Sequence, residues 1–235
     1  MHTANSVAVL IPVYNEEDNI QKVIDNIKAV IPEAGIIIVN DGSSDNSAEI
    51  ALEAGVAVIS HPFNLGYGAA LQTGYKYALR RGFKNLVQID GDGQHDPSFI
   101  PDLLDLLEKN EADVVVGSRF MSAGVYAIPF ARKIGMKLFS SIASAIMKQP
   151  ITDSTSGYQA LNRKVLQFYA DARYPVDFPD ADVLIMLKRT GFRVKEVPVK
   201  MYGSLKSMHS GLKPLYYIFK LFLSILLTML RKEKV

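Results

Sequence analysis

The segment Asn85-Leu86-Val87-Gln88-Ile89-Asp90-Gly91-Asp92-Gly93-Gln94 joins a short apolar run to a cluster of oxygen-bearing side chains. An apolar run of this length, bounded by turn residues, is typical of a strand buried inside a sheet. Because Asp-Gly dipeptides favour turns, we expect the strand to cover residues 85–90 and to end at Asp90. The segment therefore predicts a polar loop at the carboxyl end of a buried strand.

Four further apolar runs surround this segment, over residues 7–13, 35–39, 56–60 and 113–117. Helical patterns separate them, over residues 16–30, 46–54 and 69–81, and from Asp96-Pro97 to residue 109. Strands that are apolar throughout and alternate with helices are typical of a parallel sheet with helices on both faces. The sequence therefore predicts an α/β, Rossmann-like fold with a mostly parallel sheet.

The pattern changes after Gly117. We expect a helix over residues 131–147, a polar stretch over 152–158, a helix over 182–188 and an extended segment over 193–199. No linker separates the two halves. We therefore expect one domain over residues 1–210, with a nucleotide and metal half (1–119) and an acceptor half (120–210), and then a C-terminal helix over 211–235.

Composition and charge exclude several classes of protein. The 235 residues contain no cysteine, which excludes a disulfide framework and a thiolate zinc site. Residues 183–235 carry 11 Lys and Arg against 2 Asp and Glu, which leaves 15 against 22 for residues 1–182. An acidic body suits a bound cation, and a basic tail suits an anionic surface or a phosphate. The aromatic residues of the tail lie in an apolar run, not among the basic residues, so we do not expect nucleic acid as a partner.

Polar clusters follow four of the predicted strands, over residues 12–17, 40–45, 90–94 and 117–119. In open parallel sheets, ligands bind at the carboxyl ends of the strands. We therefore expect the four clusters to form one site.

Asp90, Asp92 and Gln94 offer two carboxylates and an amide oxygen within five residues. Mg²⁺ and Mn²⁺ prefer such oxygen ligands, and so few protein ligands leave positions open for a diphosphate. Gly91 and Gly93 would let backbone and ligand approach closely. An ordinary acidic turn is the alternative, but its position at the end of an apolar strand favours a metal site.

Five motifs together resemble glycosyltransferase family 2, which has the GT-A fold, near its dolichyl-phosphate mannose synthase and bacterial polyprenyl-phosphate glycosyltransferase branch. They are Ile11-Pro12-Val13-Tyr14-Asn15-Glu16, Val39-Asn40-Asp41-Gly42-Ser43-Ser44-Asp45, Asn64-Leu65-Gly66-Tyr67-Gly68, Asp90-Gly91-Asp92-Gly93-Gln94-His95 and Gly117-Ser118-Arg119. Weaker matches extend over residues 153–158 and 197–199.

The resemblance implies a pocket for the base and ribose of a UDP- or GDP-sugar, lined by Pro12, Tyr14, Glu16 and Asp41. Each of these residues also has a structural alternative. Pro12 could end a strand, Tyr14 could belong to the core, Glu16 could cap a helix, and Asp41 could stabilise a turn.

The resemblance also implies roles at the diphosphate. Asp90 would approach the ribose, sugar or metal, with Gly91 beside it, while Asp92 and Gln94 would ligate Mg²⁺ or Mn²⁺. Arg119 would contact the donor diphosphate or sugar, because an arginine that ends an apolar strand needs an anion.

The reaction that the resemblance implies inverts the configuration at the reacting sugar carbon. Asp153 would be the general base for an alcohol acceptor, and a loop cap is its alternative role. A phosphate acceptor has a second pKa near ~6 and is already ionised, so it needs cations more than a base. Arg132 is the candidate from the resemblance. Lys206 is a second candidate, because residues 200–207 lack the arginine that relatives usually carry there.

Residues 215–230 form an apolar run interrupted by Lys220, Ser224 and Thr228 and followed by basic residues. A helix of this length spans about 24 Å, which is short of a ~30 Å bilayer core. We therefore expect an amphipathic helix on the membrane surface, at the cytoplasmic face. Packing on the core, on a second copy or on a membrane protein is the alternative.

The sequence thus predicts a metal-dependent, inverting glycosyltransferase of cell-envelope glycan biosynthesis, with polyprenyl phosphate as acceptor. A saccharide acceptor is one alternative. A non-catalytic nucleotide-sugar-binding partner is another, kept open by the altered segment over residues 200–207.

Overall fold

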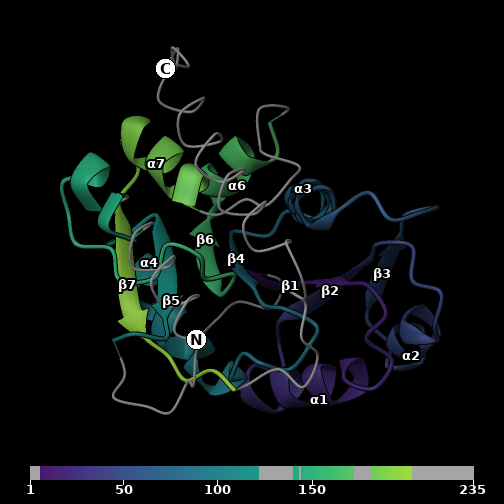
Figure 1. The fold of residues 1–235 in the computed structure, drawn as a ribbon. Coiled ribbons are helices and arrows are strands. Elements are labelled where there is room, and N and C mark those ends of the chain that lie inside the picture. Colours follow the sequence, from purple (N-terminus) through teal and green to yellow (C-terminus); the bar gives the residue numbers. More distant parts are fainter. Residues whose placement is uncertain (1–5, 122–139, 143, 172–180, 203–235) are drawn as a thin grey trace, which may run out of the picture.

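The computed structural model describes residues 6–121, 140–142, 144–171 and 181–202. Within these ranges the strands form one sheet in the order β3-β2-β1-β4-β6-β5-β7 (Figure 1). The strands are β1 (Val7–Val13), β2 (Gly35–Asn40), β3 (Ala57–Ser60), β4 (Asn85–Gln88), β5 (Val114–Ser118), β6 (Gln159–Asn162) and β7 (Val194–Pro198). Only β6 runs antiparallel to its neighbours among these strands, so the expected mostly parallel sheet is confirmed.

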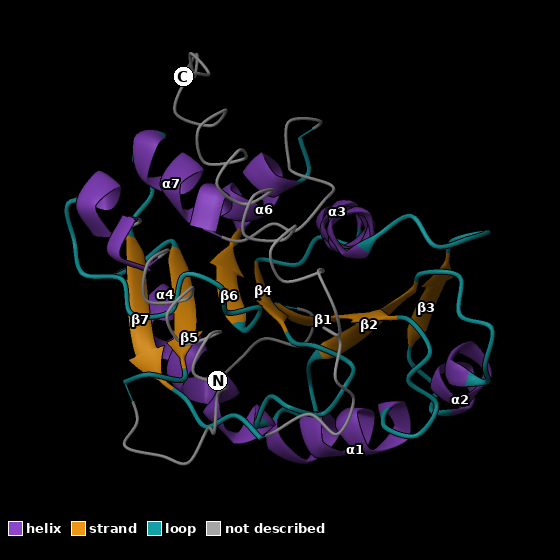
Figure 2. Ribbon diagram, viewed as in Figure 1, coloured by secondary structure: helices purple, strands orange, loops and turns teal. Residues whose placement is uncertain are grey.

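Helices cover both faces of the sheet, as expected (Figure 2). One face carries α3 (Tyr67–Arg80), α6 (Arg163–Tyr169) and α7 (Ala181–Arg189). The other carries α1 (Ile20–Val30), α2 (Ser47–Glu53) and α4 (Ile100–Glu108), with the short 3₁₀ turn η1 (Pro97–Phe99) before α4.

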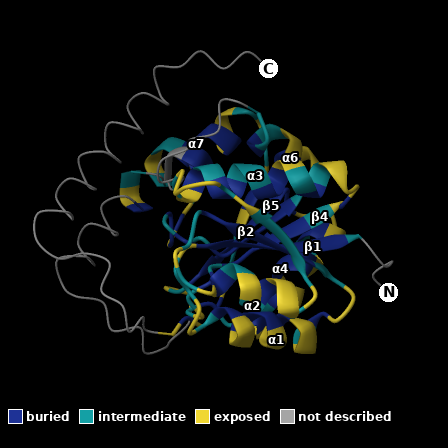
Figure 3. Ribbon diagram, turned by 90° about the vertical axis from the view of Figure 1, so that its right-hand side faces the viewer, coloured by how far each residue is buried: buried dark blue, intermediate teal, exposed yellow. Residues whose placement is uncertain are grey.

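Side chains of alternate residues on each central strand pack into two separate apolar cores. On β1, Ala8 and Leu10 pack toward α3, while Val9 and Ile11 pack toward α1. Because both faces are buried, the strands are apolar at every position, which is the pattern expected for a parallel sheet between helical layers. Figure 3 shows the result, with buried strands inside and exposed residues along the outer sides of α1 and α2.

Three elements differ from the expectation. Helix α1 begins at Ile20 rather than residue 16, because the chain first makes a turn in which the Glu16 carbonyl accepts from Asn19 and Ile20. Strand β6 and helix α6 were not expected at all. Strand β6 has four residues, too few for a periodic pattern, and its partners on β4 and β5 lie more than 40 residues away.

The position of β6 decides how the two halves of the chain meet. Its partners β4 and β5 both belong to residues 1–119, so a strand of the second half completes the sheet of the first. Because β6 is antiparallel, its amino end lies at the same edge as the carboxyl ends of β4 and β5. Residues 152–158, which precede β6, are thereby brought to that edge.

Part of the expected second half falls outside the described residues. Of the helix expected over 131–147, residues 140–142 and 144–147 are helical and the rest are not described. Among the described residues, no helix is long and apolar enough to cross a membrane. The C-terminal helix expected over 211–235 lies wholly outside the described residues.

Candidate active site

The oxygen-rich loop after β4 lies at the predicted edge of the sheet. Asp90 is partly exposed, and its Oδ1 accepts a hydrogen bond of 2.8 Å from the Tyr67 hydroxyl. Asp92 Oδ1 accepts from the Gln94 backbone N–H at 3.0 Å, and Asp92 Oδ2 contacts Gln94 Nε2. The three predicted ligands therefore gather at one strand end, where solvent reaches them.

The donor set of this loop fits a hard divalent cation. It offers two carboxylates and one amide oxygen, which is the ligand chemistry that Mg²⁺ and Mn²⁺ prefer. No group of three His, Asp or Glu side chains that could hold a metal occurs among the described residues.

The loops after β1 and β2 are hydrogen-bonded to each other beside this cluster. Asn15 Oδ1 accepts from the Ser44 backbone at 2.8 Å, and the Ser43 hydroxyl accepts from the Asn15 backbone at 3.0 Å. Tyr14 is 50% exposed, so the alternative that it belongs to the core is wrong. Its ring is available to a ligand.

Pro12, Glu16 and Gly91 occupy the same region. Pro12 is buried, and a Cβ placed on Gly91 would lie 3.3 Å from the Pro12 carbonyl oxygen. Gly91 therefore lies close against the end of β1. Glu16 accepts from the Asn19 side chain at 2.7 Å, just before α1, so this contact joins two side chains and not a carboxylate to a backbone N–H of the helix.

Asp41 anchors the loop that leads into α3. Its Oδ1 accepts from Leu65 N at 2.9 Å and lies 2.7 Å from His61 Nδ1, while its Oδ2 accepts from Gly66 N at 2.9 Å. Gly66 has a φ of 99°, which a residue with a Cβ rarely adopts. The buried carboxylate therefore fixes the start of α3 from the end of β2.

Arg119 and Asp153 form a buried, two-pronged ion pair. Arg119 Nε and Nη2 donate to the two carboxylate oxygens at 2.6 and 3.0 Å, and the Asp153 side chain is 0% exposed. Nη2 also donates to the carbonyl oxygen of Thr155 at 3.2 Å. The anion that an arginine at this position requires is thus supplied by the chain itself.

Glu196 on β7 binds the backbone of the segment that carries Asp153. Its carboxylate accepts from the backbone N–H groups of Thr152 and Asp153, each at 2.8 Å. Burial raises the pKa of Glu196 above its ordinary value, against the opposing effect of these donors. Sequence patterns gave no sign of this role, because Glu196 lies in a half-exposed edge strand.

Residues 8–169 match the family model described as Glycosyl transferase family 2. The chain belongs to glycosyltransferase family 2.

Two relatives of this family 2 glycosyltransferase are named for the lipid phosphates on which they act. A polyprenol monophosphomannose synthase of Mycolicibacterium smegmatis is 34% identical, over 68% of this chain and 62% of that protein. A UDP-N-acetylglucosamine–dolichyl-phosphate N-acetylglucosaminyltransferase of Methanococcus voltae is 29% identical, over 96% of this chain and 97% of that protein.

The fold resembles solved structures of another glycosyltransferase. Glucosyl-3-phosphoglycerate synthase from Mycobacterium tuberculosis, in complex with Mn²⁺, UDP and phosphoglyceric acid, aligns with a TM-score of 0.75. The alignment covers 98% of this chain and 80% of that chain at 20% identity. At this identity the likeness shows the GT-A-like fold.

Two predicted residues fall outside the described part of the chain, and two unexpected residues lie at the site. Arg132 and Lys206 lie outside the described residues. Tyr67 and Gly157 were not expected to matter, yet both contact the Asp90 region. The signal for Tyr67 was its place in a family motif at the start of a helix.

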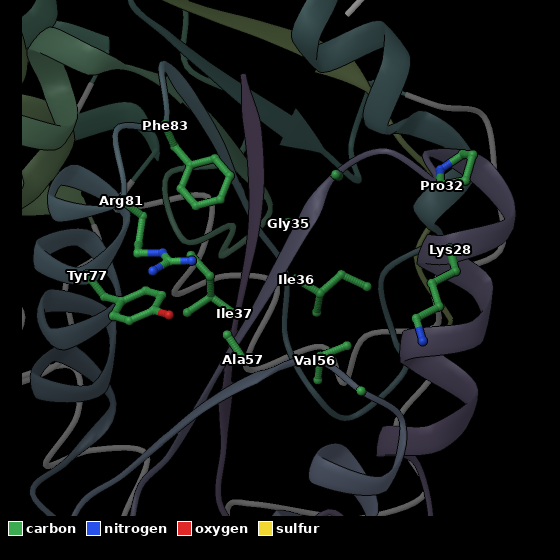
Figure 4. Close-up of a pocket in the computed structure, with 12 residues that line it drawn as sticks. Lys28, Pro32, Gly35, Ile36, Ile37, Val56, Ala57, Tyr77, Arg81 and Phe83 are labelled. Atoms are coloured by element: carbon green, nitrogen blue, oxygen red, sulfur yellow. The ribbon is translucent and has the colours of Figure 1, made fainter. Parts of the chain in front are cut away.

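A separate cavity of about 430 Å³ lies at the opposite edge of the sheet, near the amino ends of β2 and β3 (Figure 4). Gly35, Ile37 and Ala57 line it from the strands, and Tyr77 of α3 and Arg81 just after α3 line it from the helix. Because ligands of such sheets bind at the carboxyl ends, this cavity is not the donor site of the family 2 fold.

Proposed function

We propose that this family 2 glycosyltransferase moves a sugar from a UDP- or GDP-sugar to a polyprenyl phosphate, with inversion at the sugar carbon. The observation that carries the proposal is the convergence of Asp90, Asp92 and Gln94 with the Arg119–Asp153 pair at one edge of the sheet. The relatives that act on polyprenyl and dolichyl phosphates support the choice of acceptor.

The donor would lie across the carboxyl ends of β1, β2 and β4. Tyr14 would pack against the base, with Pro12, Glu16 and Asp41 around the nucleoside. Asp92, Gln94 and Asp90 would hold Mg²⁺ or Mn²⁺, which when bound would neutralise negative charge on the diphosphate. An exposed aromatic ring beside a cluster of carboxylates suits a ligand with a flat base and an anionic, cation-bound handle.

Arg119 would supply positive charge where the leaving diphosphate develops negative charge. Its guanidinium is already oriented by both oxygens of Asp153, so little reorganisation is needed during the reaction. Asp153 would then act mainly by holding Arg119.

The geometry around Asp153 favours a phosphate over an alcohol acceptor. A general base needs an oxygen within reach of the acceptor, but Asp153 is 0% exposed and both its oxygens accept from Arg119. A phosphate monoester, with a second pKa near ~6, arrives largely ionised and needs no base. Positioning by cations is then sufficient, and Arg132 and Lys206 are the candidates.

We further propose that residues 211–235 keep the enzyme on the cytoplasmic face of the membrane, where a polyprenyl phosphate would be available. Charge supports this proposal, because basic residues follow the apolar run directly.

The test is a screen of UDP- and GDP-sugars with Mn²⁺, with and without polyprenyl phosphate, read by mass spectrometry of the lipid. A glycosylated lipid phosphate is the expected product. Transfer only to a saccharide would replace the acceptor in the proposal. Binding of nucleotide sugar with no transfer to either acceptor would support the non-catalytic alternative.

A further inference from the structure

A line of hydrogen bonds runs from the core of the protein to Asp90. The Tyr75 hydroxyl donates to Gln88 Oε1 at 2.5 Å, Gln88 Nε2 donates to the Tyr67 oxygen at 3.1 Å, and the Tyr67 hydroxyl donates to Asp90 Oδ1 at 2.8 Å. Tyr75 is 0% exposed and Gln88 is 3% exposed. The line therefore begins inside the apolar core and ends at the active-site loop.

The donor and the acceptor of each hydrogen bond in this line are fixed, starting from Asp90. An ionised carboxylate only accepts, so Tyr67 gives its single hydrogen to Asp90. Tyr67 must then accept from the amide nitrogen of Gln88, which leaves the amide oxygen of Gln88 to accept from Tyr75.

The Tyr67 hydroxyl is enclosed although the residue as a whole is 37% exposed. Gln88 and Asp90 contact it from β4 and the following loop, and Gly157 closes over it. A Cβ on Gly157 would lie 2.9 Å from the hydroxyl and 3.2 Å from Asp90 Oδ2. A Cβ at this position would displace the hydroxyl, so the segment before β6 packs closely against the pair.

The second oxygen of Asp90 is held less tightly. His95 Nδ1 accepts from the Asp90 backbone N–H at 3.1 Å, which places the proton of a neutral imidazole on Nε2. That Nε2 lies 3.7 Å from Asp90 Oδ2, beyond ordinary hydrogen-bond distance. The two oxygens of Asp90 therefore differ: Oδ1 is occupied by a phenol and Oδ2 is not held by a close donor from His95.

We infer that Tyr67 is a positioning residue, which fixes Asp90 in one orientation and leaves Oδ2 as the oxygen that meets the donor or its cation. The inference rests on the proposed function, because it assigns the donor to the Asp90 loop. Tyr67 itself would not touch the reacting atoms. Its effect would pass through Asp90.

The test measures binding of UDP in the presence of Mn²⁺ by calorimetry. Tyr67→Phe removes the hydroxyl and keeps the ring, and we expect affinity to fall about tenfold or more, as for loss of a partner that orients a metal ligand. Tyr77→Phe is the matched control, because Tyr77 lies on the same helix but lines the cavity at the opposite edge. It should bind like the wild type.

A double-mutant cycle shows whether Tyr67 acts through Asp90. In the Asp90→Asn background, Tyr67→Phe should cause little further loss, because the group it orients has changed. An equal loss in both backgrounds, or wild-type affinity of Tyr67→Phe, would overturn the inference.

Tyr75→Phe separates positioning from general destabilisation. Tyr75 does not contact Asp90, so this variant should lower the melting temperature and keep the affinity for UDP and Mn²⁺. If affinity instead falls in step with melting temperature in both tyrosine variants, the role is structural and the inference fails. All these measurements use binding, so they remain decisive even if no lipid phosphate is ever glycosylated.

Discussion

Asp92 lies in the loop after β4, where its carboxylate contacts Gln94 and no basic partner among the described residues. We predict that Asp92→Asn weakens Mn²⁺-dependent binding of UDP by more than the ~10–100-fold typical of an outer-sphere ligand loss, because a direct ligand is removed. Calorimetry with Mn²⁺ and with EDTA measures this effect. Asp25→Asn, on the exposed side of α1, is the control. Equal UDP affinity with Mn²⁺ and with EDTA in the wild type would contradict the metal role.

Asp153 differs from Asp92 because its partner is a buried cation. We predict that Asp153→Asn lowers the free energy of unfolding by roughly 3–5 kcal/mol, since it leaves the Arg119 guanidinium without its counter-charge in a buried position. Urea denaturation measures the loss. An unchanged stability would mean that the ion pair is not formed in solution.

The same variant also bears on the acceptor. If Asp153 only holds Arg119, the variant should keep its rate dependence on pH while losing turnover. If Asp153 were instead the general base, its replacement would remove one limb of the pH–rate profile.

At the scale of elements, the Asp113 carboxylate, just before β5, pairs with Arg193, just before β7. The Arg193 guanidinium holds the pKa of Asp113 below its ordinary value of 3.8, and Asn162 donates to the same carboxylate at 2.8 Å. A carboxyl with a lowered folded-state pKa contributes stability above its unfolded pKa and loses it as the pH falls through the folded one.

We therefore predict that Asp113→Asn costs about 1 kcal/mol at pH 7, a low value for charged hydrogen bonds because Arg193 is half exposed. The difference from wild type should shrink below pH 3.8 and vanish once both states are protonated. Urea denaturation at several pH values measures it. Asp105→Asn, which removes an exposed pair between α4 and Lys109 at its C-terminal end, should change little at any pH. A difference that persists in acid would contradict the electrostatic account.

At the scale of the whole molecule, charge is distributed unevenly along the chain, with the basic excess in residues 183–235. We predict that deletion of residues 211–235 moves the protein from the membrane fraction to the soluble fraction, because the apolar run and its basic flank are lost. Retention of the truncated protein on membranes would place the contact elsewhere.

The basic flank can be tested alone with vesicles that contain anionic lipid. Each Lys or Arg near such a surface contributes about 1 kcal/mol, so replacing Arg231, Lys232 and Lys234 with Gln should weaken binding strongly. Neutral vesicles are the control and should show a much smaller change.

The sequence by itself determined the parallel strands β1 to β5, the helices between them and the family. Strands buried on both faces must be apolar throughout, and ligand loops must follow them, so the positions of Asp41, Asp90, Asp92 and Arg119 at strand ends were visible in the order of residues. These are local patterns, which a single chain segment displays.

Only the tertiary structure decided what each of these side chains contacts. Strand β6 is antiparallel and four residues long, and its insertion between β4 and β5 brings Asp153 to Arg119 and Gly157 to Asp90. Asp41 proved to hold the start of α3, which in turn places Tyr67 over Asp90. Such pairs are separated by 23 to 67 residues, and no periodic pattern encodes them, because they arise when distant segments fill the same volume.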